Sequence, residues 1–573
     1  MLRGLSVWCL LGAPLVAAGC TGTIGADASG NGGPSQIGPD GKPKPPVGPE
    51  GKPGAGALSD KDTVPGAAPV RRLTRLEYDN TIRDLLGLGS VTADFTADTE
   101  SNTSGFARGG AIAVGDDARV MLAAGASVAD QIGGKLGSLL PCPVTAPAAE
   151  QDGCVTKFIT QFGKRAYRRP LTAHETQLMQ DLYKAQRAPD VGATFEQAMA
   201  TLVGAIIQAP QFLYHWELGS NAPTKDGNLI KYNSYEIASK LSYLLWKTMP
   251  DDKLFEAADG DALATPEQIA LQARRMLDDD KAKMGLADFH LQWSEIGDLV
   301  KIPKDDSIKD YNPDVAQAMI NETRDFVTST LLGKGPGTLQ ALLTSNQTVA
   351  DARLAKIYGA SASGTTPQPL TLDAKQRAGI FTLLAFLTAK ADTGDSHPVK
   401  RGDTILRRTL CMEFKLPDNV PPVADSTPGG ATTRERFSMH SMMPCATCHV
   451  IIDPIGFAFE EFDAIGAYRT MDQGKKIDST GTATTPGGAT LKFNDAVDLM
   501  NQMAALPEVS DCLTTQWLRY MLGRREVAGE TPSQKVILDE FKKANYDLKA
   551  LLVALTRTRT FTHRSVSPGE VTQ

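Results

Sequence analysis

The chain has 573 residues, of which 42% are hydrophobic and 22% are charged, and its formal net charge is −7. A chain of this length exceeds one ordinary hydrophobic core, so we expect two to four helical units. Lysine and arginine are spread along the sequence without a basic run, which together with the negative charge argues against nucleic-acid binding. The composition is that of a globular protein, so most of the chain should fold.

The N-terminus has the pattern of an export signal. Arg3 precedes an apolar stretch, residues 5–18, that is too short to span a bilayer as a stable helix. The run Leu15-Val16-Ala17-Ala18-Gly19-Cys20 then resembles a bacterial lipoprotein signal, in which the cysteine is lipidated and becomes the new N-terminus. We therefore expect a signal peptide at residues 1–19, a lipid on Cys20, and an exported, membrane-anchored protein that faces the periplasm or the cell surface. An ordinary secretory peptide cleaved near Ala18 is the alternative.

Residues 20–67 differ in composition from everything that follows. They are crowded with glycine, proline, serine and lysine and contain almost no large apolar residue. Such a stretch cannot bury enough surface to offset the entropy lost on ordering it. We expect a disordered tether that holds a folded body away from the membrane.

Helix start signals recur from Val70 onward. A capping residue is followed three positions later by Glu or Gln, and then by apolar residues at helical spacing. Such signals begin at Thr74, Thr172, Asn233, Thr265 and Thr531. After the last two, a proline occupies the expected first helical position. Strand signals are few, and residues 478–494 are expected to form a hairpin at most.

These patterns predict a mainly α protein of several multi-helical modules, with little β structure. Clusters of glycine, proline, threonine and aspartate mark the boundaries between the modules. The expected helical modules are residues 68–135, 136–220, 221–360, 373–472 and 473–573, the fourth of which contains the cysteine motif described below.

Four cysteines of the mature chain fit disulfides, because an exported protein meets an oxidising environment. Cys142 and Cys154 flank a short loop rich in proline and alanine, and a local disulfide that closes this loop is the simplest interpretation. Cys411 and Cys512 are the remaining single cysteines, and a bond between them would join the motif region to the C-terminal helices.

The sequence Cys445-Ala446-Thr447-Cys448-His449 has the C-x-x-C-H pattern of covalent haem attachment. Two thiols on one helical turn can each add to a haem vinyl group, and the adjacent imidazole then binds the iron as proximal ligand. We therefore expect one covalent haem c, in the C-terminal third of the chain. A redox disulfide, half of a zinc site and a relic that binds no haem are the alternatives, although the first lacks a βαβ context and the second lacks another paired cluster.

The second axial ligand is open. Met500 and Met503 share one helical face downstream of the motif and would give His/Met ligation, whereas His440 would give bis-His ligation. Methionines at helical spacing are also ordinary core residues, and a five-coordinate iron is a further possibility. Three arginines near the motif are candidate partners for haem propionates: Arg434, Arg436 and Arg469.

Several longer motifs resemble one known family. They are Arg71-Arg72-Leu73-Thr74-Arg75-Leu76-Glu77-Tyr78, Arg168-Arg169-Pro170-Leu171-Thr172, Pro398-Val399-Lys400-Arg401-Gly402, Asp453-Pro454-Ile455-Gly456 and Leu522-Gly523-Arg524. With these motifs the chain resembles the planctomycete-type cytochrome c-like, multi-module proteins of unknown function, over nearly everything after the tether. The resemblance implies export and haem, but it implies no reaction, and the label "cytochrome c-like" rests on the same C-x-x-C-H motif.

Three functions are compatible with these features. The first is electron transfer through the haem, to a redox partner protein or within the chain. The second is a haem enzyme acting on peroxide or an extracellular polymer, with the helical body forming the substrate site. The third is a non-catalytic surface protein for binding or assembly, with a structural cysteine motif. The chain lacks the G-x-S-x-G, H-E-x-x-H and glycine-loop motifs of common hydrolases and nucleotide enzymes, so no catalytic residue is assigned.

Overall fold

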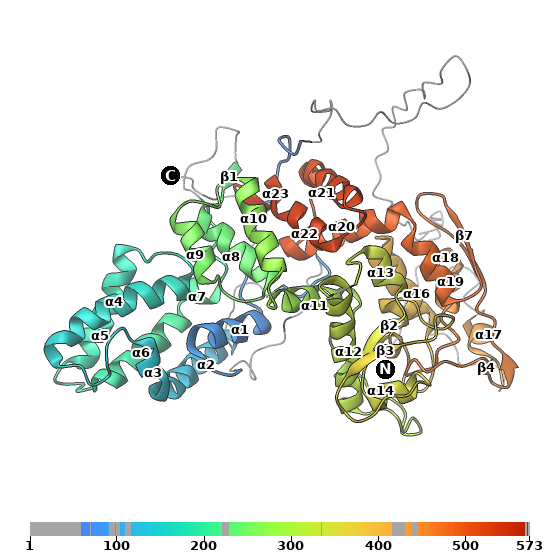
Figure 1. Ribbon diagram of the computed structural model, residues 1–573, viewed down its shortest axis with the longest axis horizontal. Helices are drawn as coiled ribbons and strands as arrows, with labels where there is room; N and C mark the ends of the chain where they lie inside the picture. Colours follow the sequence, from blue (N-terminus) through green and yellow to red (C-terminus); the bar gives the residue numbers. More distant parts are fainter. Residues whose placement is uncertain are drawn as a thin grey trace, which may run out of the picture.

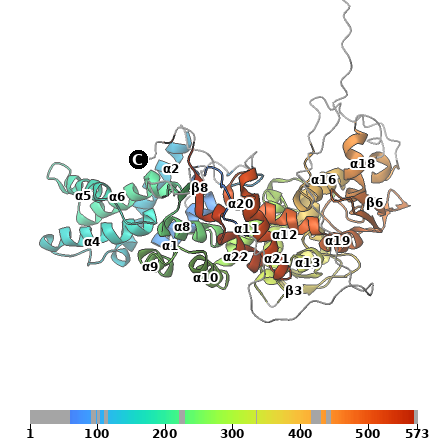
Figure 2. The same cartoon turned by 90° about the horizontal axis from the view of Figure 1, so that it is seen from above.

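The structure is a computed structural model, and it describes residues 59–68, 70–90, 98, 104–108, 116–219, 229–333, 335–414, 430–437, 445–567 and 570. The expected signal peptide, Cys20 and His440 lie outside these residues. The described chain is mainly helical with small two-stranded sheets, as the sequence predicts. Its helices form three groups along the long axis of the molecule (Figures 1 and 2).

The first group holds the N-terminal helices around a hydrophobic core of their own. Its elements are α1 (Arg75–Leu86), α2 (Asp116–Ile132), α3 (Leu136–Leu139), α4 (Ala148–Tyr167), α5 (Ala173–Arg187), α6 (Phe195–Gln208) and α7 (Pro210–Leu213). Helix α6 is the centre of this group, because α2, α4, α5 and α7 all pack on it.

The middle group combines helices that are far apart in the sequence. Its early members are α8 (Ser234–Leu245), α9 (Asp252–Asp259), α10 (Pro266–Leu277) and α11 (Ala282–Trp293). Its late members are α20 (Pro507–Leu522), α21 (Thr531–Lys543), α22 (Leu548–Thr556) and α23 (Arg559–Thr562). Helix α22 packs on α10, and α20 packs on α11, so the end of the chain returns to the middle of the molecule (Figure 1). Strand β1 (Leu229–Lys231) pairs with β8 (His563–Ser565) at the same place.

The third group carries the cysteine motif. Its helices are α12 (Pro313–Leu331), α13 (Leu339–Thr344), α14 (Ala352–Ile357), α15 (Leu384–Ala389), α16 (Pro398–Thr409), α17 (Thr433–Phe437), α18 (Ala446–Phe457) and α19 (Ala496–Ala504). Its strands are β2 (Gln347–Ala350), β3 (Gln368–Thr371), β4 (Met471–Asp472), β5 (Lys475–Lys476), β6 (Gly481–Thr484) and β7 (Thr490–Phe493), which pair in sequence order. The middle and third groups share the larger of two hydrophobic cores.

Local signals placed most helix starts correctly. Full capping boxes are present at Thr74, Thr172, Asn233 and Thr265. The expected cap at Thr531 is wrong by one residue, because the turn Ala528–Glu530 runs directly into α21 and makes Thr531 its first residue. The expected hairpin within 478–494 is confirmed as β6 and β7, but the other three strand pairs were not expected.

Both expected disulfides are confirmed. Cys142 bonds to Cys154 beside α4, and Cys411 at the end of α16 bonds to Cys512 of α20. The second bond joins the third group of helices to the middle group, as the sequence interpretation proposed.

The last residues of the expected tether are part of the folded body. The Thr63 and Ser533 hydroxyls lie 3.0 Å apart, the Val64 amide donates to the Gly529 carbonyl at 2.8 Å, and the Gly66 amide donates to Glu530 at 3.0 Å. Residues 60–66 therefore bind the C-terminal helices, although they fall within the range expected as a tether. No helix in the described ranges has the length and apolar character needed to cross a membrane.

Candidate functional site

The cysteine motif lies at the start of α18. Cys445 is the residue before the helix, Cys448 lies in its first turn, and both are half-buried. Neither thiol is disulfide-bonded, in contrast to the other four cysteines of the described chain. Because one helical turn spans 3.6 residues, both sulfur atoms belong to the same end of one helix.

Two glycines set the position of α18 by letting it touch the backbone of α16. A Cβ atom on Gly402 would lie 2.4 Å from the Ile452 carbonyl oxygen, and one on Gly456 would lie 2.1 Å from the Pro398 carbonyl oxygen. Both distances are far below van der Waals contact, so any side chain at either position would push the helices apart. The motif is thus carried on a helix that is fixed at its C-terminal half.

His449 is oriented by a carboxylate one turn further along the same helix. Its Nδ1 atom lies 2.8 Å from Oδ1 of Asp453, which is 9% exposed. Because a carboxylate only accepts, Nδ1 is the donor in this contact, and a metal would bind this histidine through Nε2. This is the arrangement seen for ligand histidines in general, where the second nitrogen is held by an acceptor outside the metal.

The three arginines proposed to bind propionates are engaged by the protein itself. Arg434 donates to the Asp478 and Thr480 carbonyls and lies 4.7 Å from the Phe457 ring. Arg436 pairs with Asp395, and Arg469 contacts Glu460 at 3.3 Å and Asp472 at 3.6 Å. These contacts attach the segment of β4 and β5 to α17 and to the end of α18. The role observed for all three is structural.

The two candidate methionine ligands are core residues of α19. Met500 and Met503 are completely buried, and α19 packs on α13 and β7. Packing in the core explains the positions of both side chains without an iron ligand. Their assignment as a distal ligand stays a prediction, as does that of His440.

A cavity of about 340 Å³ lies beside the end of α18. Glu460 lines it and is 2% exposed, and burial raises the pKa of this carboxyl above its ordinary value. The hydroxyl of Ser396 donates to Glu460 at 2.8 Å. Within the described residues, no group of three or more histidine, cysteine, aspartate or glutamate side chains is placed to hold a metal ion.

Family models match the chain in five consecutive segments. Each is described as a protein of unknown function: DUF1587 at residues 71–132, DUF1595 at 154–217, DUF1592 at 232–360, DUF1588 at 377–472 and DUF1585 at 491–561. The chain belongs to the planctomycete cytochrome c-like multi-module family. The cysteine motif lies in the DUF1588 module. Among curated proteins there is no significant match, and no solved structure is similar either.

Four of the five modules meet at a buried cluster of charges, which we call the charge junction. Its members are Arg71, Glu77, Arg108, His215, Lys247, Asp288 and Tyr520. Glu77 of the DUF1587 module is at the centre and is completely buried. It lies 3.3 Å from Arg108, 3.3 Å from His215 of the DUF1595 module and 3.6 Å from Lys247 of the DUF1592 module.

The other side of the charge junction is formed by the C-terminal module. The Tyr520 hydroxyl of DUF1585 donates to Asp288, which also lies 3.0 Å from the Lys247 ammonium. The guanidinium of Arg108 and the ammonium of Lys247 lie 4.4 and 4.5 Å from the centre of the Tyr520 ring. Both cations therefore contact one buried aromatic ring.

Burial and neighbouring charges shift the titration of this cluster. Burial alone would raise the pKa of Glu77, but Arg71 and Arg108 outweigh it and hold that pKa well below its ordinary value. Burial, assisted by Arg108, lowers the pKa of Lys247 to about 8. Burial, assisted by Arg71, lowers the pKa of His215 to about 3, so this ring is neutral.

The sequence interpretation did not identify the charge junction. Glu77 was recognised only as the last residue of a capping box, a role that it does have, since it accepts from the Thr74 amide at 3.1 Å. Its other partners lie far away in the sequence. A local pattern carries no signal for such a cluster, because each member taken alone has the appearance of a surface charge.

Proposed function

We propose that this chain is an exported, lipid-anchored protein that carries one covalent haem c on Cys445 and Cys448 and transfers electrons to a partner protein. The observation that carries the proposal is the state of these cysteines. They are half-buried on one helical turn and outside any disulfide, in a chain whose other described cysteines are all paired.

Cys445, Cys448 and His449 fit the requirements of a covalent haem. Thioether attachment needs two thiols at this spacing, and the iron needs one imidazole nitrogen. His449 would meet the second need: with Nδ1 donating to Asp453, the iron would bind through Nε2. When bound, the haem supplies a one-electron couple. The protein holds the proximal imidazole in one tautomer and fixes α18 against α16 through Gly402 and Gly456.

Export is supported by the disulfides. Bonds such as Cys142–Cys154 and Cys411–Cys512 persist in oxidising compartments and are rare in the cytosol, and covalent haem is attached outside the cytoplasm as well. The proposed lipid on Cys20 would then tie the body to a membrane. Labelled palmitate incorporated by the full-length protein and lost in Cys20→Ser tests this attachment separately.

Co-expression of the full-length chain with a cytochrome c maturation system tests the haem. We expect haem that stays with the protein after acid denaturation and a sharp α band after reduction. Cys448→Ala and His449→Ala should abolish or reduce covalent haem, whereas Cys9→Ala, which alters a cysteine of the expected signal peptide, should leave the haem content of the exported protein unchanged.

The spectrum also separates the proposal from its alternatives. A low-spin, six-coordinate iron supports electron transfer, whereas a high-spin ferric iron that binds cyanide or peroxide would point to a haem enzyme. Protein that contains no covalent haem after maturation, with Cys445 and Cys448 titrating as thiols or as a disulfide, would overturn the proposal.

A further inference from the structure

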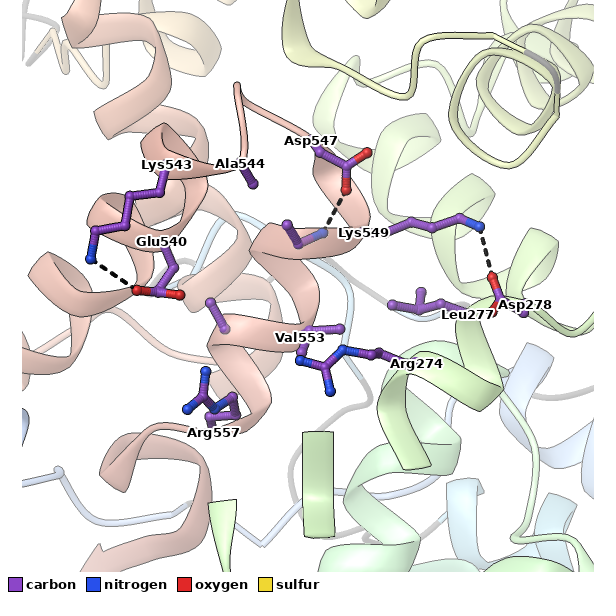
Figure 3. Close-up of a pocket in the computed structure, with 12 residues that line it drawn as sticks. Arg274, Leu277, Asp278, Glu540, Lys543, Ala544, Asp547, Lys549, Val553 and Arg557 are labelled. Atoms are coloured by element: carbon purple, nitrogen blue, oxygen red, sulfur yellow. Dashed lines mark hydrogen bonds and ion pairs between the residues drawn. The ribbon is translucent and has the colours of Figure 1, made fainter. Parts of the chain in front are cut away.

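A groove of about 490 Å³ lies far along the chain from the cysteine motif, between α10, α21 and α22 (Figure 3). It is formed by the DUF1592 and DUF1585 modules, whose helices α10 and α22 pack together on one side of it. Its volume is in the range of pockets that bind small organic molecules, roughly 300–1,000 Å³.

The wall of the groove is apolar along α22. Val553 and Ala554 lie on this helix with Ala550, and Leu277 faces them from the end of α10. Three of the lining residues, Ala544, Ala550 and Ala554, are alanines. Small side chains at these positions keep the helices from filling the space between them.

Most of the charges around the groove are matched within the protein. Lys543 contacts Glu540 at 3.1 Å, and Lys549 contacts Asp278 at 2.9 Å. Asp547 accepts from the Ala550 amide at 2.7 Å as the N-cap of α22. In Figure 3 the Lys543–Glu540 pair lies at the left of the groove, Asp547 at the top and the Lys549–Asp278 pair at the right, and these groups need no further partner.

Two arginines at the other end are less well matched within the protein. Arg274, in the last turn of α10, has neither an ion pair nor a side-chain hydrogen bond among the described residues, and it reaches across the groove toward Val553 (Figure 3). Arg557, which ends α22, has a buried Nε atom without a hydrogen-bond partner. Its nearest carboxylate is that of Glu267, which is 3.7 Å away and 76% exposed.

We propose that this groove binds a small organic anion, with its carboxylate or phosphate group held by Arg274 and Arg557 and its apolar part lying on Val553 and Leu277. Guanidinium groups present planar donors that match the oxygen atoms of such anions. An anion bound at this end of the groove would be attracted by two positive charges. The site is independent of the haem proposal, because neither arginine belongs to the DUF1588 module.

Isothermal titration calorimetry of the full-length protein with benzoate, phenyl phosphate and inorganic phosphate tests the site. We expect saturable binding of benzoate or phenyl phosphate. Arg274→Gln and Arg557→Gln should each weaken that binding about tenfold, the loss of one charge-assisted contact. Arg324→Gln is the matched control, because Arg324 is an exposed helical arginine of α12 that does not line the groove.

A change in the apolar wall gives a second and independent readout. Ala554→Leu fills the groove beside Val553 and should weaken phenyl phosphate more than inorganic phosphate. Circular dichroism melting of each variant identifies loss of folding. Tighter binding of phenyl phosphate than of benzoate would identify a phosphate ligand, and the reverse a carboxylate ligand.

Three results would overturn the proposal: no saturable binding of either organic anion, equal binding by the arginine variants and the Arg324→Gln control, or inorganic phosphate binding as tightly as phenyl phosphate. The last result would show that the apolar wall does not contribute to the affinity for the ligand.

Discussion

The start of α18 and the charge junction hold reactive and charged side chains in opposite settings. Around Cys445 and His449, reactive groups come from one short helix and are half-buried. Around Glu77, charged and polar groups come from four modules, and Glu77 and Lys247 at the centre are completely buried. Half-buried groups can exchange water for a cofactor at little cost, whereas buried charges depend on one another. The half-buried start of α18 is therefore suited to binding a cofactor, and the charge junction is suited to holding the modules together.

Removing the central carboxylate, Glu77, is the strongest test of whether the buried charges of the charge junction depend on one another. In Glu77→Gln, Arg108 and Lys247 lose their common counter-charge in a region without water. We expect a loss of about 3–5 kcal/mol in the free energy of unfolding, measured by urea denaturation.

Glu175→Gln is the matched control for this change. Glu175 has the same capping-box position in α5 and pairs with Arg169, but that pair is partly exposed. The control should lose about 1 kcal/mol or less. Equal losses in the two variants would show that Glu77 acts only as a cap.

The pH dependence of stability tests the same region through Lys247. The folded chain releases this proton near pH 8, and the unfolded chain keeps it until its ordinary pKa of 10.5. Between these values the unfolded state binds more protons, so stability should rise with pH, by up to about 1.4 kcal/mol per pH unit. In Lys247→Met this contribution should disappear, and parallel curves for the two proteins from pH 8 to 10 would contradict the assignment.

A smaller effect is expected where α16 and α18 touch. In Gly456→Ala, the new methyl group meets the Pro398 carbonyl, and we expect a loss of about 1–3 kcal/mol together with less covalent haem per protein. Gly153→Ala is the control, because Gly153 is exposed in α4 and its Cβ would meet nothing within 4 Å. That variant should be unchanged or more stable by up to about 1 kcal/mol. Equal loss of haem in Gly456→Ala and Gly153→Ala would show that the contact between α16 and α18 does not control haem attachment.

The smallest effect concerns the polarity of the His449 contact. Asp453→Asn keeps an acceptor for Nδ1 but removes its negative charge, so the imidazole becomes a weaker electron donor. We expect the reduction potential of the haem protein to rise by about 59 mV, which equals a tenfold change for one electron. Spectroelectrochemical titration measures it, and an unchanged or lower potential would contradict this role for Asp453.

Interactions between residues close together in the sequence were predicted better than distant ones. The Cys411–Cys512 bond is the exception, because these were the two single cysteines that remained. The capping box at Thr74, the disulfide from Cys142 to Cys154 and the helical position of Cys448 depend on neighbours in the sequence, and all were expected. The charge junction and the pairing of β1 with β8 depend on residues hundreds of positions apart, for which local periodicity contains no information.

The groove of Arg274 and Arg557 was not predictable for the same reason. Each arginine lies near the end of a different helix, where a positive side chain normally interacts with the carbonyls of its own helix. Only the packing of α10 on α22 brings the two guanidinium groups to one end of a shared groove.

The closure of the chain on itself has a consequence for biogenesis. Strand β1 cannot pair until β8 has been synthesised, and the Ser565 amide donates to the carbonyl of Gly66 at 3.2 Å. The pairing of β1 and the attachment of residues 60–66 therefore form only after the C-terminal helices have been made. Such long-range closure slows folding and leaves surfaces exposed while it is incomplete. The surfaces that β1 and residues 60–66 cover stay exposed until the C-terminal helices have been made.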